Sequence, residues 1–270
     1  MFNIKIDYPT TSRNEPRYVP EHTNPHINRA ISRHDDAYRN RLVGFERYFE
    51  KLSKVDVINR GDSGEAHYVN PFLPGLDAVA LYCILAEAKA NRYIELGSGY
   101  STRFARRSIK DNGLNTTILS VDPNPRADVG ELCDQIIRKP AEEVGLDIFE
   151  QLEQNDVLFI DGSHRCFMNS DVTVCFLDIL PLLKKGVFVQ IHDIWWPVDY
   201  PQEWADRYYN EQYLVGTLLA NGMQNFEIVL PNYYISTTRE LAALVDPLWN
   251  SNPRFAPVEK QGHSFWLRRI

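Results

Sequence analysis

The segment Arg92-Tyr-Ile-Glu-Leu-Gly-Ser-Gly-Tyr-Ser-Thr102 decides the fold of this chain. Its first half is a short apolar run, which predicts a buried parallel strand. Gly97 and Gly99 then allow a sharp turn, and they let a ligand approach the backbone where a Cβ would clash. Ser101 is expected to start a helix that runs from Thr102 to Ile109, so that backbone N–H groups of the turn face the ligand. Strand, glycine turn and helix together open a nucleotide-binding βαβ unit.

Glu95 narrows the class of ligand. A dinucleotide fingerprint needs a third small residue where Thr102 stands, so the segment gives a pyrophosphate little support. A carboxylate two residues before the first glycine instead suits a ligand with a cationic ammonium or sulfonium group. The alternative is a purely structural turn with an exposed Glu95.

The composition limits the partners. The 270 residues can hold one large α/β domain and an appendage. A net charge of −7 argues against nucleic acid, and no apolar run is long enough to span a membrane. The N-terminus lacks the features of a signal peptide, and the four cysteines form no C-x-x-C pair. We therefore expect a cytoplasmic protein without a membrane or nucleic-acid partner.

Strands alternate with helices after the glycine turn, which predicts a parallel, doubly wound α/β sheet. Two further strands near the end of the chain are predicted to form an antiparallel pair at the sheet edge. The predicted strands cover residues 117–122, 135–138, 156–161, 187–191, 226–230 and 264–268. The predicted helices cover residues 35–55, 76–90, 142–152, 169–183, 203–219 and 238–249. Residues 1–34 are predicted to form a proline-broken arm, and helix 35–55 to pack on the main domain or on a second subunit.

Polar residues follow three of the predicted strands, at the edge where such sheets bind ligands. Asp122 lies 23 residues beyond Gly99, where a ribose diol would donate hydrogen bonds to its carboxylate. The alternative is that Asp122 only caps the next helix. Asp161 ends another strand, and the pair His192-Asp193 ends the one after it.

These motifs resemble those of class I S-adenosylmethionine-dependent methyltransferases, over roughly residues 76–270. The similarity is greatest to a bacterial subgroup marked by D-G-S-H and H-D-I at two strand ends. The resemblance implies a mostly parallel, seven-stranded Rossmann-like sheet with a terminal antiparallel hairpin. Residues 1–75 would then be an N-terminal helical extension that serves as a lid or an interface. The motifs that carry the resemblance are Glu95-Leu-Gly-Ser-Gly99, Asp122, Asp161-Gly-Ser-His164 and His192-Asp-Ile194.

The resemblance also implies S-adenosylmethionine as the cofactor. Glu95 would help to hold its ammonium group, Asp122 its ribose hydroxyls, and Pro123 or residues 138–142 would border its adenine. The residues expected to bind the cofactor are Glu95, Gly97, Ser98, Gly99, Tyr100, Ser101, Asp122, Pro123 and Asp161.

Asp161, His164, His192 and Asp193 are the expected catalytic residues. In one mechanism His164 or His192 acts as general base, since an unperturbed histidine pKa of about 6.5 suits proton removal from a hydroxyl. In another, Asp161, His192 and Asp193 hold a divalent metal that lowers the pKa of the acceptor hydroxyl. Metal-dependent O-methyltransferases are similar but have an Asp-Asn pair in place of His-Asp, and a nitrogen ligand shifts preference away from magnesium. A purely structural role is the third alternative.

Aromatic residues are dense between Trp195 and Tyr213, which fits either an acceptor pocket or packing at a helix or subunit interface. His67 and His263 have no partner pattern and are expected to be surface or core histidines. The sequence therefore predicts a methyltransferase that O-methylates a small molecule, such as a sugar or natural product. An NAD(P)-dependent oxidoreductase and a non-catalytic binding module are the alternatives, and a homo-oligomer is left open.

Overall fold

The computed structural model describes residues 15–61, 64–125 and 129–270. The first part of the predicted N-terminal arm, including Pro9, lies outside these residues.

The described residues form one seven-stranded sheet with the strand order β3-β2-β1-β4-β5-β7-β6. Strands β1 to β5 are parallel, and β7 lies between β5 and β6 and is antiparallel to both. The predicted doubly wound sheet with a terminal antiparallel pair is thus confirmed. The strands are β1 (Arg92–Leu96), β2 (Thr117–Val121), β3 (Gln135–Ile137), β4 (Val157–Ile160), β5 (Phe188–Ile191), β6 (Phe226–Pro231) and β7 (Phe265–Arg269).

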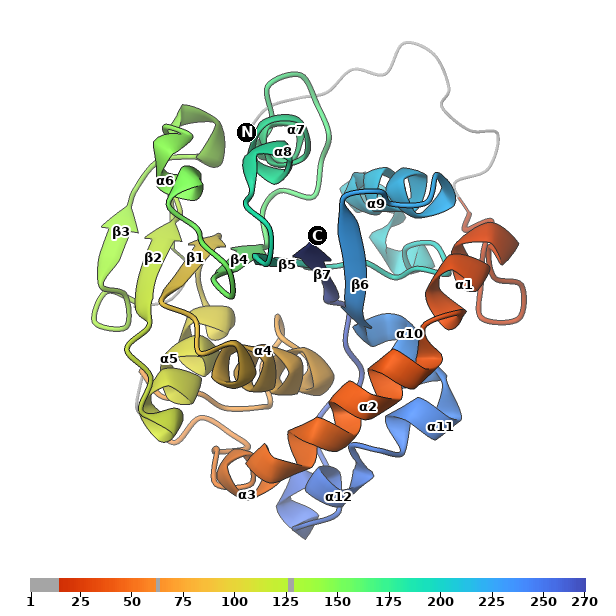
Figure 1. The fold of residues 1–270 in the computed structure, drawn as a ribbon. Helices are drawn as coiled ribbons and strands as arrows, with labels where there is room; N and C mark the ends of the chain where they lie inside the picture. Colours follow the sequence, from red (N-terminus) through yellow and green to blue (C-terminus); the bar gives the residue numbers. More distant parts are fainter. Residues whose placement is uncertain (1–14, 62–63, 126–128) are drawn as a thin grey trace.

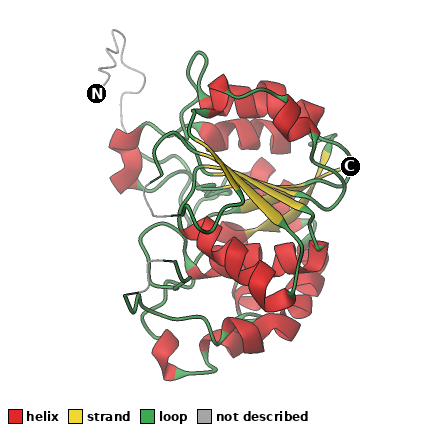
Figure 2. Cartoon of the chain, turned by 90° about the vertical axis from the view of Figure 1, so that its left-hand side faces the viewer, coloured by secondary structure: helices red, strands yellow, loops and turns green. Residues whose placement is uncertain are grey.

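Helices cover both faces of the sheet, so the molecule has three layers (Figure 2). On one face lie α4 (Gly75–Ala88) and α5 (Tyr100–Asn112), and on the other α7 (Asp171–Val174) and α8 (Leu180–Leu182) (Figure 1). Every residue of β4 and β5 is buried. A parallel strand covered on both faces has no solvent side, which accounts for the apolar run of β4 and for the apolar residues on either side of the buried Gln190 in β5. Helix α4 is also apolar on nearly all sides, because the sheet and neighbouring helices enclose it.

The N-terminal helices pack on the C-terminal part of the same chain. These are α1 (Pro25–Ser32), α2 (Asp35–Phe45) and α3 (Phe49–Leu52). Helix α1 packs on α9 (Glu211–Ala220), α2 on α11 (Arg239–Ala242) and β6, and α3 on α12 (Asp246–Trp249) (Figure 1). The Tyr234 hydroxyl donates to Asp35 across this contact, at 3.0 Å. Of the two predicted partners for helix 35–55, the main body is the one observed, and the boundary near residue 75 stays a prediction.

Several predicted helices are shorter or interrupted in the structure. The predicted helix 169–183 is α7, a π-helical segment (Cys175–Ile179) and α8. Pro181 in α8 has no N–H to continue a regular ladder, which fits a break at this point. Helix 142–152 is reduced to α6 (Asp147–Glu150), and 203–219 is a 3₁₀ helix (Gln202–Arg207) followed by α9. Helix α10 (Asn232–Thr237) has no counterpart among the predictions. The remaining 3₁₀ helices are Glu46–Tyr48, Ala141–Glu143 and Pro253–Phe255.

Within the described residues, no helix combines the length and the apolar character that a membrane crossing requires.

The glycine turn gives a test of the fold. Gly97 has φ +84°, and a Cβ at this position would lie 2.1 Å from the carbonyl oxygen of Asp161. We expect Gly97→Ala to lower the free energy of unfolding by about 2–4 kcal/mol, through backbone strain and this clash. Gly113 is the matched control, because it has φ +60° and open space around its Cβ position. Gly113→Ala should cost only about 1–2 kcal/mol in urea unfolding, and equal losses for both variants would contradict the steric argument.

Candidate functional site

The carboxyl ends of β1, β2, β4 and β5 border one cleft with a volume of about 1370 Å³. The residues that border it include the glycine turn, Asp122, Asp161, His164, His192 and Asp193. The segment 70–74 before α4 and the segment 201–211 before and at the start of α9 also border the cleft. Topology therefore brings together the strand ends that the sequence indicated.

Gly97 and Gly99 are required or tolerated in the turn for different structural reasons. Gly97 must be glycine because its backbone has positive φ and touches the Asp161 carbonyl. Gly99 has an extended backbone, and nothing lies within 4 Å of its Cβ position. Gly99 therefore faces open space, where a ligand can approach the main chain. Helix α5 begins at Tyr100, two residues before the predicted start.

Glu95 lies beneath the turn and is completely buried. Its carboxylate accepts hydrogen bonds from Thr102 Oγ1 at 2.6 Å, the Tyr93 hydroxyl at 3.2 Å and Ser101 Oγ at 3.3 Å. Burial raises its pKa to about 7, although these hydrogen bonds favour the charged form. The predicted contact of Glu95 with a cofactor ammonium is not supported by this position, and neither is the alternative of an exposed side chain. Glu95 therefore stabilises the turn by accepting hydrogen bonds from Ser101 and Thr102 at the start of α5.

Asp122 organises the other side of the turn. Its Oδ2 accepts hydrogen bonds from the backbone N–H and the hydroxyl of Ser98, both at 2.8 Å, and its Oδ1 accepts one from the Asn124 N–H. The side chain therefore joins the end of β2 to the glycine turn while it borders the cleft. Ser98, Tyr100 and Pro123 border the same cleft, as does part of the 138–142 segment expected near the adenine.

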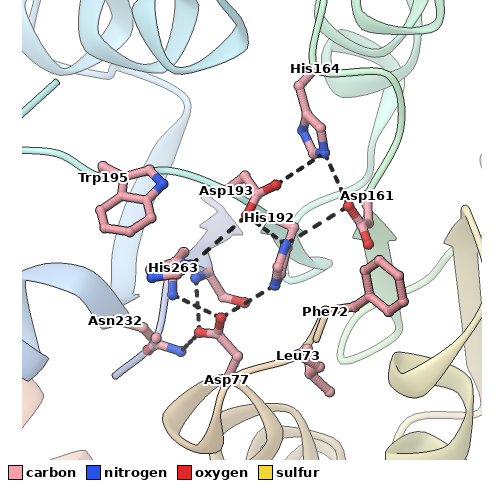
Figure 3. Close-up of polar contacts among 12 residues, drawn as sticks. Phe72, Leu73, Asp77, Asp161, His164, His192, Asp193, Trp195, Asn232 and His263 are labelled. Carbon is pink, nitrogen blue, oxygen red and sulfur yellow. Dashed lines mark hydrogen bonds and ion pairs between the residues drawn. The ribbon is translucent and has the colours of Figure 1, made fainter. Parts of the chain in front are cut away.

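Acidic and histidine side chains form a compact cluster at the ends of β4 and β5 (Figure 3). His192 Nδ1 lies 3.2 Å from Asp193 Oδ1 and 3.8 Å from Asp161 Oδ1. His164 Nε2 lies 3.2 Å from Asp161 Oδ1 and 3.4 Å from Asp193 Oδ2. The four predicted catalytic residues are thus brought into direct contact. Asp161 is the most open of them, with 36% of its side chain exposed.

Each of the two central histidines has a buried carboxylate on its far side. His164 Nδ1 contacts Glu211 Oε2 at 2.9 Å, and His192 Nε2 lies 3.3 Å from Asp77 Oδ2. Both carboxylates are fully or almost fully buried. A carboxylate behind a histidine fixes the orientation of the ring and makes its other nitrogen a stronger donor to a metal.

The surrounding negative charge raises the pKa of both histidines. Burial lowers a histidine pKa, but hydrogen bonds to Asp161 and Glu211 raise that of His164 well above its ordinary value. For His192, the negative charges of Asp193 and Asp161 outweigh burial in the same way. The pKa of Asp193 is lowered, because the histidines around it outweigh its burial. The general-base role assumed an unperturbed histidine, and neither His164 nor His192 has an unperturbed pKa.

Aromatic side chains form one wall of the cleft. Trp195 stacks on His263 with ring centroids 3.8 Å apart, and Trp204 meets Trp195 edge to face. Trp195, Trp204 and Tyr209 border the cleft, whereas Trp196 is buried against α9, where a Cβ on Gly216 would lie 2.5 Å from its ring. The aromatic segment therefore both borders the cleft and packs on α9, and the predicted acceptor pocket stays a prediction.

The sequence missed three members of the site, which are Asp77, Glu211 and His263. Asp77 is the only acid in the otherwise apolar residues 75–86 of α4. This pattern could have indicated a buried acid that needs polar partners. Glu211 looks like an ordinary acid in the first turn of a helix. His263 is buried, in line with the core alternative, and it also lies 3.9 Å from Asp193 and borders the cleft. His67 is buried against Tyr100, as the core alternative predicted.

A comparison with protein families decides the class of this domain. Residues 94–194 match a family model described as a methyltransferase domain. The matched segment begins in β1 and ends just after β5, so it contains the glycine turn, Asp122, Asp161 and the His192-Asp193 pair. The predicted methyltransferase is thereby confirmed for this part of the chain. No curated protein matches the sequence.

Solved structures similar to this chain include several methyltransferases. The S-adenosylhomocysteine-bound methyltransferase PaMTH1 of Podospora anserina shares 14% identity over 85% of this chain and 88% of its own, with a TM-score of 0.44. An O-methyltransferase from Bacillus cereus shares 16% identity over 86% and 90%, with a TM-score of 0.38. The plantazolicin methyltransferase BpumL shares 12% identity over 90% and 99%, with a TM-score of 0.41. Likeness at this level carries no information on substrate or mechanism.

The protonated histidines predict how stability depends on pH. In the cation-free protein, His164 and His192 hold protons above pH 6.5 that the unfolded chain has lost. Their contribution is full below about pH 6.5 and is lost as the pH rises through the folded-state pKa values. His263 has a lowered pKa, so its effect is confined to pH values below about 6.5. Urea unfolding with a chelator at about pH 6.5, 7.5 and 8.5 should give falling free energies of unfolding. Glu95, with a pKa of about 7, adds to the decline at the lower end of this range, so the histidine part is measured between about pH 7.5 and 8.5.

Glu211→Gln should make this decline shallower, because it removes the carboxylate that holds the proton on His164. Identical slopes for the variant and the unchanged protein would contradict the assignment of this pair.

Proposed function

We propose that the protein is an S-adenosylmethionine-dependent methyltransferase that methylates a hydroxyl group of a small molecule. The observation that carries the proposal is one cleft that joins a glycine turn and a ribose-type carboxylate to an acid–histidine cluster, in a segment that matches methyltransferase domains. The glycine turn and Asp122 form the cofactor side, and the cluster with its aromatic wall forms the acceptor side. The aromatic wall suits the ring faces of a sugar or a flat natural product.

Methyl transfer from a sulfonium is an in-line displacement, so the protein supplies alignment and a way to remove the hydroxyl proton. Asp122 would bind the ribose, and the open face of Gly99 would admit the methionine part against the backbone. Asp161 borders the cleft with 36% of its side chain exposed. Its carboxylate would orient the acceptor hydroxyl towards the methyl group.

The donor set of the cluster fits a divalent metal. Asp161, His192 and Asp193 each offer one ligand atom, and these atoms lie within 4.8 Å of one another. Donors about 2.1 Å from a cation and at right angles to each other lie about 3 Å apart, close to the observed contacts. Asp77 stands behind His192 as an orienting carboxylate would. Such a metal would lower the pKa of the acceptor hydroxyl, and its binding would displace the protons that the cluster otherwise holds.

The raised pKa values of His164 and His192 favour this metal role over general base catalysis by either residue. Asp161 and Asp193 both lie beside His164 and His192. Their negative charge favours a positive charge at this place, either as protons on the histidines or as a bound cation. The nitrogen ligand favours a transition metal or zinc over magnesium.

The cysteines indicate the cellular compartment of the enzyme. The cysteines at positions 83, 133, 166 and 175 are all free thiols, two of them buried, which suits a reducing compartment. We therefore place the enzyme in the cytoplasm, with a small-molecule acceptor and without a nucleic-acid partner.

Calorimetric titration with S-adenosylhomocysteine tests the proposal, with NADH titrated in parallel. We expect S-adenosylhomocysteine to bind at micromolar concentration, on the order of −8 kcal/mol, and NADH to give no heat of binding. Binding of NADH alone, or of neither compound, would overturn the methyltransferase.

Asp122→Ala should weaken S-adenosylhomocysteine binding by about 1.5–3 kcal/mol, because charge-assisted hydrogen bonds to the ribose are lost. Glu131→Ala removes an exposed acid from the following segment and should leave the affinity unchanged. The comparison uses the same titration, and an unchanged affinity of the Asp122 variant would remove this residue from the site.

Asp193→Asn should reduce binding of Mn²⁺ or Zn²⁺ by at least about tenfold, because a charged ligand is lost. The control is Asp178→Asn, an exposed acid on the π-helical segment. Cation binding is followed by calorimetry and S-adenosylhomocysteine affinity in parallel. Equal cation affinity in both variants would leave the cluster without a metal.

A further inference from the structure

Arg103 is a buried cation beside the glycine turn. It lies in the first turns of α5, is only 7% exposed and borders the cleft. Its guanidinium carbon lies 5.2 Å from the centre of the Tyr100 ring, and Nη1 donates a long hydrogen bond of 3.4 Å to the carbonyl of Glu65. These contacts fix the side chain between α5 and the segment that leads to α4.

Arg103 differs from its neighbours on α5 because no carboxylate pairs with it within the described residues. Arg106 contacts Asp134 at 2.8 Å, and Arg107 contacts Asp111 at 2.7 Å. The Nε of Arg103 is buried and has no hydrogen-bond partner among the residues that the structure describes. A buried charge without a counter-ion is costly, so an anion from outside the chain would satisfy it and the free Nε.

The position of Arg103 indicates which anion this is. Helix α5 directs its N-terminus towards the same part of the cleft, which adds a partial positive charge next to the guanidinium. Asp122, on the opposite side of the turn, has a negative charge suited to ribose hydroxyls and unsuited to an anion. A ligand that places its ribose at Asp122 and lies along the turn has its other end close to Arg103.

We infer that Arg103 binds the carboxylate of the methionine part of S-adenosylmethionine, an inference that rests on the proposed function. The free Nε edge of a guanidinium offers two parallel N–H donors, which match the two oxygens of a carboxylate. Tyr100 supports the guanidinium from one side by a cation–π contact. The cleft also contains Arg207, but this residue is exposed and lies over Trp204 at 4.1 Å, within the aromatic wall.

The inference can be tested with two ligands that differ only at the end of interest. S-adenosylhomocysteine carries the amino acid part, whereas 5′-methylthioadenosine has the same adenosine and sulfur without the carboxylate and amino group. Calorimetry with Arg103→Met should give about a 10- to 100-fold loss of affinity for S-adenosylhomocysteine and no change for 5′-methylthioadenosine. Arg103→Lys keeps the charge and should restore part of the loss.

Lys110→Met is the matched control, because it removes one positive charge from an exposed position of the same helix. It should bind both ligands as the unchanged protein does. Equal S-adenosylhomocysteine affinity for the Arg103→Met variant and the unchanged protein would overturn the inference. A parallel loss of both ligands in that variant would also overturn it, since Arg103 would then only support the turn.

An unchanged protein that binds 5′-methylthioadenosine but not S-adenosylhomocysteine would overturn the carboxylate contact and leave the adenosine site in place. An unchanged protein that binds neither ligand would overturn the proposed function, and the inference with it.

Discussion

The carboxylate of Asp77 is the contact on which the acid–histidine cluster of the cleft depends. It accepts hydrogen bonds from the backbone N–H groups of His263 and Ser264, at 2.7 and 2.8 Å, and from the side chain of Asn232 at 2.7 Å. It also faces His192 Nε2. One buried acid on α4 thereby joins the start of β7, the start of α10 and the end of β5. The Gly262 backbone is held so close that a Cβ there would lie 2.5 Å from Asp77 Oδ1.

A buried carboxylate with this many donors is stable only when all of them are in place. Asp77 has a lowered pKa because His192, His263 and these hydrogen bonds outweigh its burial. The position of the cluster is therefore set by α4, the helix that precedes β1 and the glycine turn in the chain. The cofactor side has its own buried acid, Glu95, which holds the turn through the hydroxyls of Thr102, Tyr93 and Ser101.

The sequence predicted the parts of this arrangement that local pattern determines. The apolar runs gave the strands, and the residues after them gave Asp122, Asp161 and His192-Asp193, because parallel strands end at one edge of the sheet. Helix ends were less predictable: Pro181 and the π-helical segment before it divide a helix whose apolar stripe is continuous. The partners of the cluster could not be predicted in this way. Glu211 and Asp77 reach the histidines from elements far away in the chain, and only the tertiary structure shows that they are adjacent.

Strand β7 lies between β5 and β6, and this order has a consequence for the growing chain. A polypeptide leaves the ribosome from its N-terminus, so β1 to β5 and the glycine turn can assemble while β7 is still to be made. During that interval β5, with the sequence Phe188-Val-Gln-Ile191, is an unpaired edge strand and Asp77 lacks its backbone donors. The strand order thus leaves the β5 edge open to wrong strand pairing until β7, the last strand in the chain, is made.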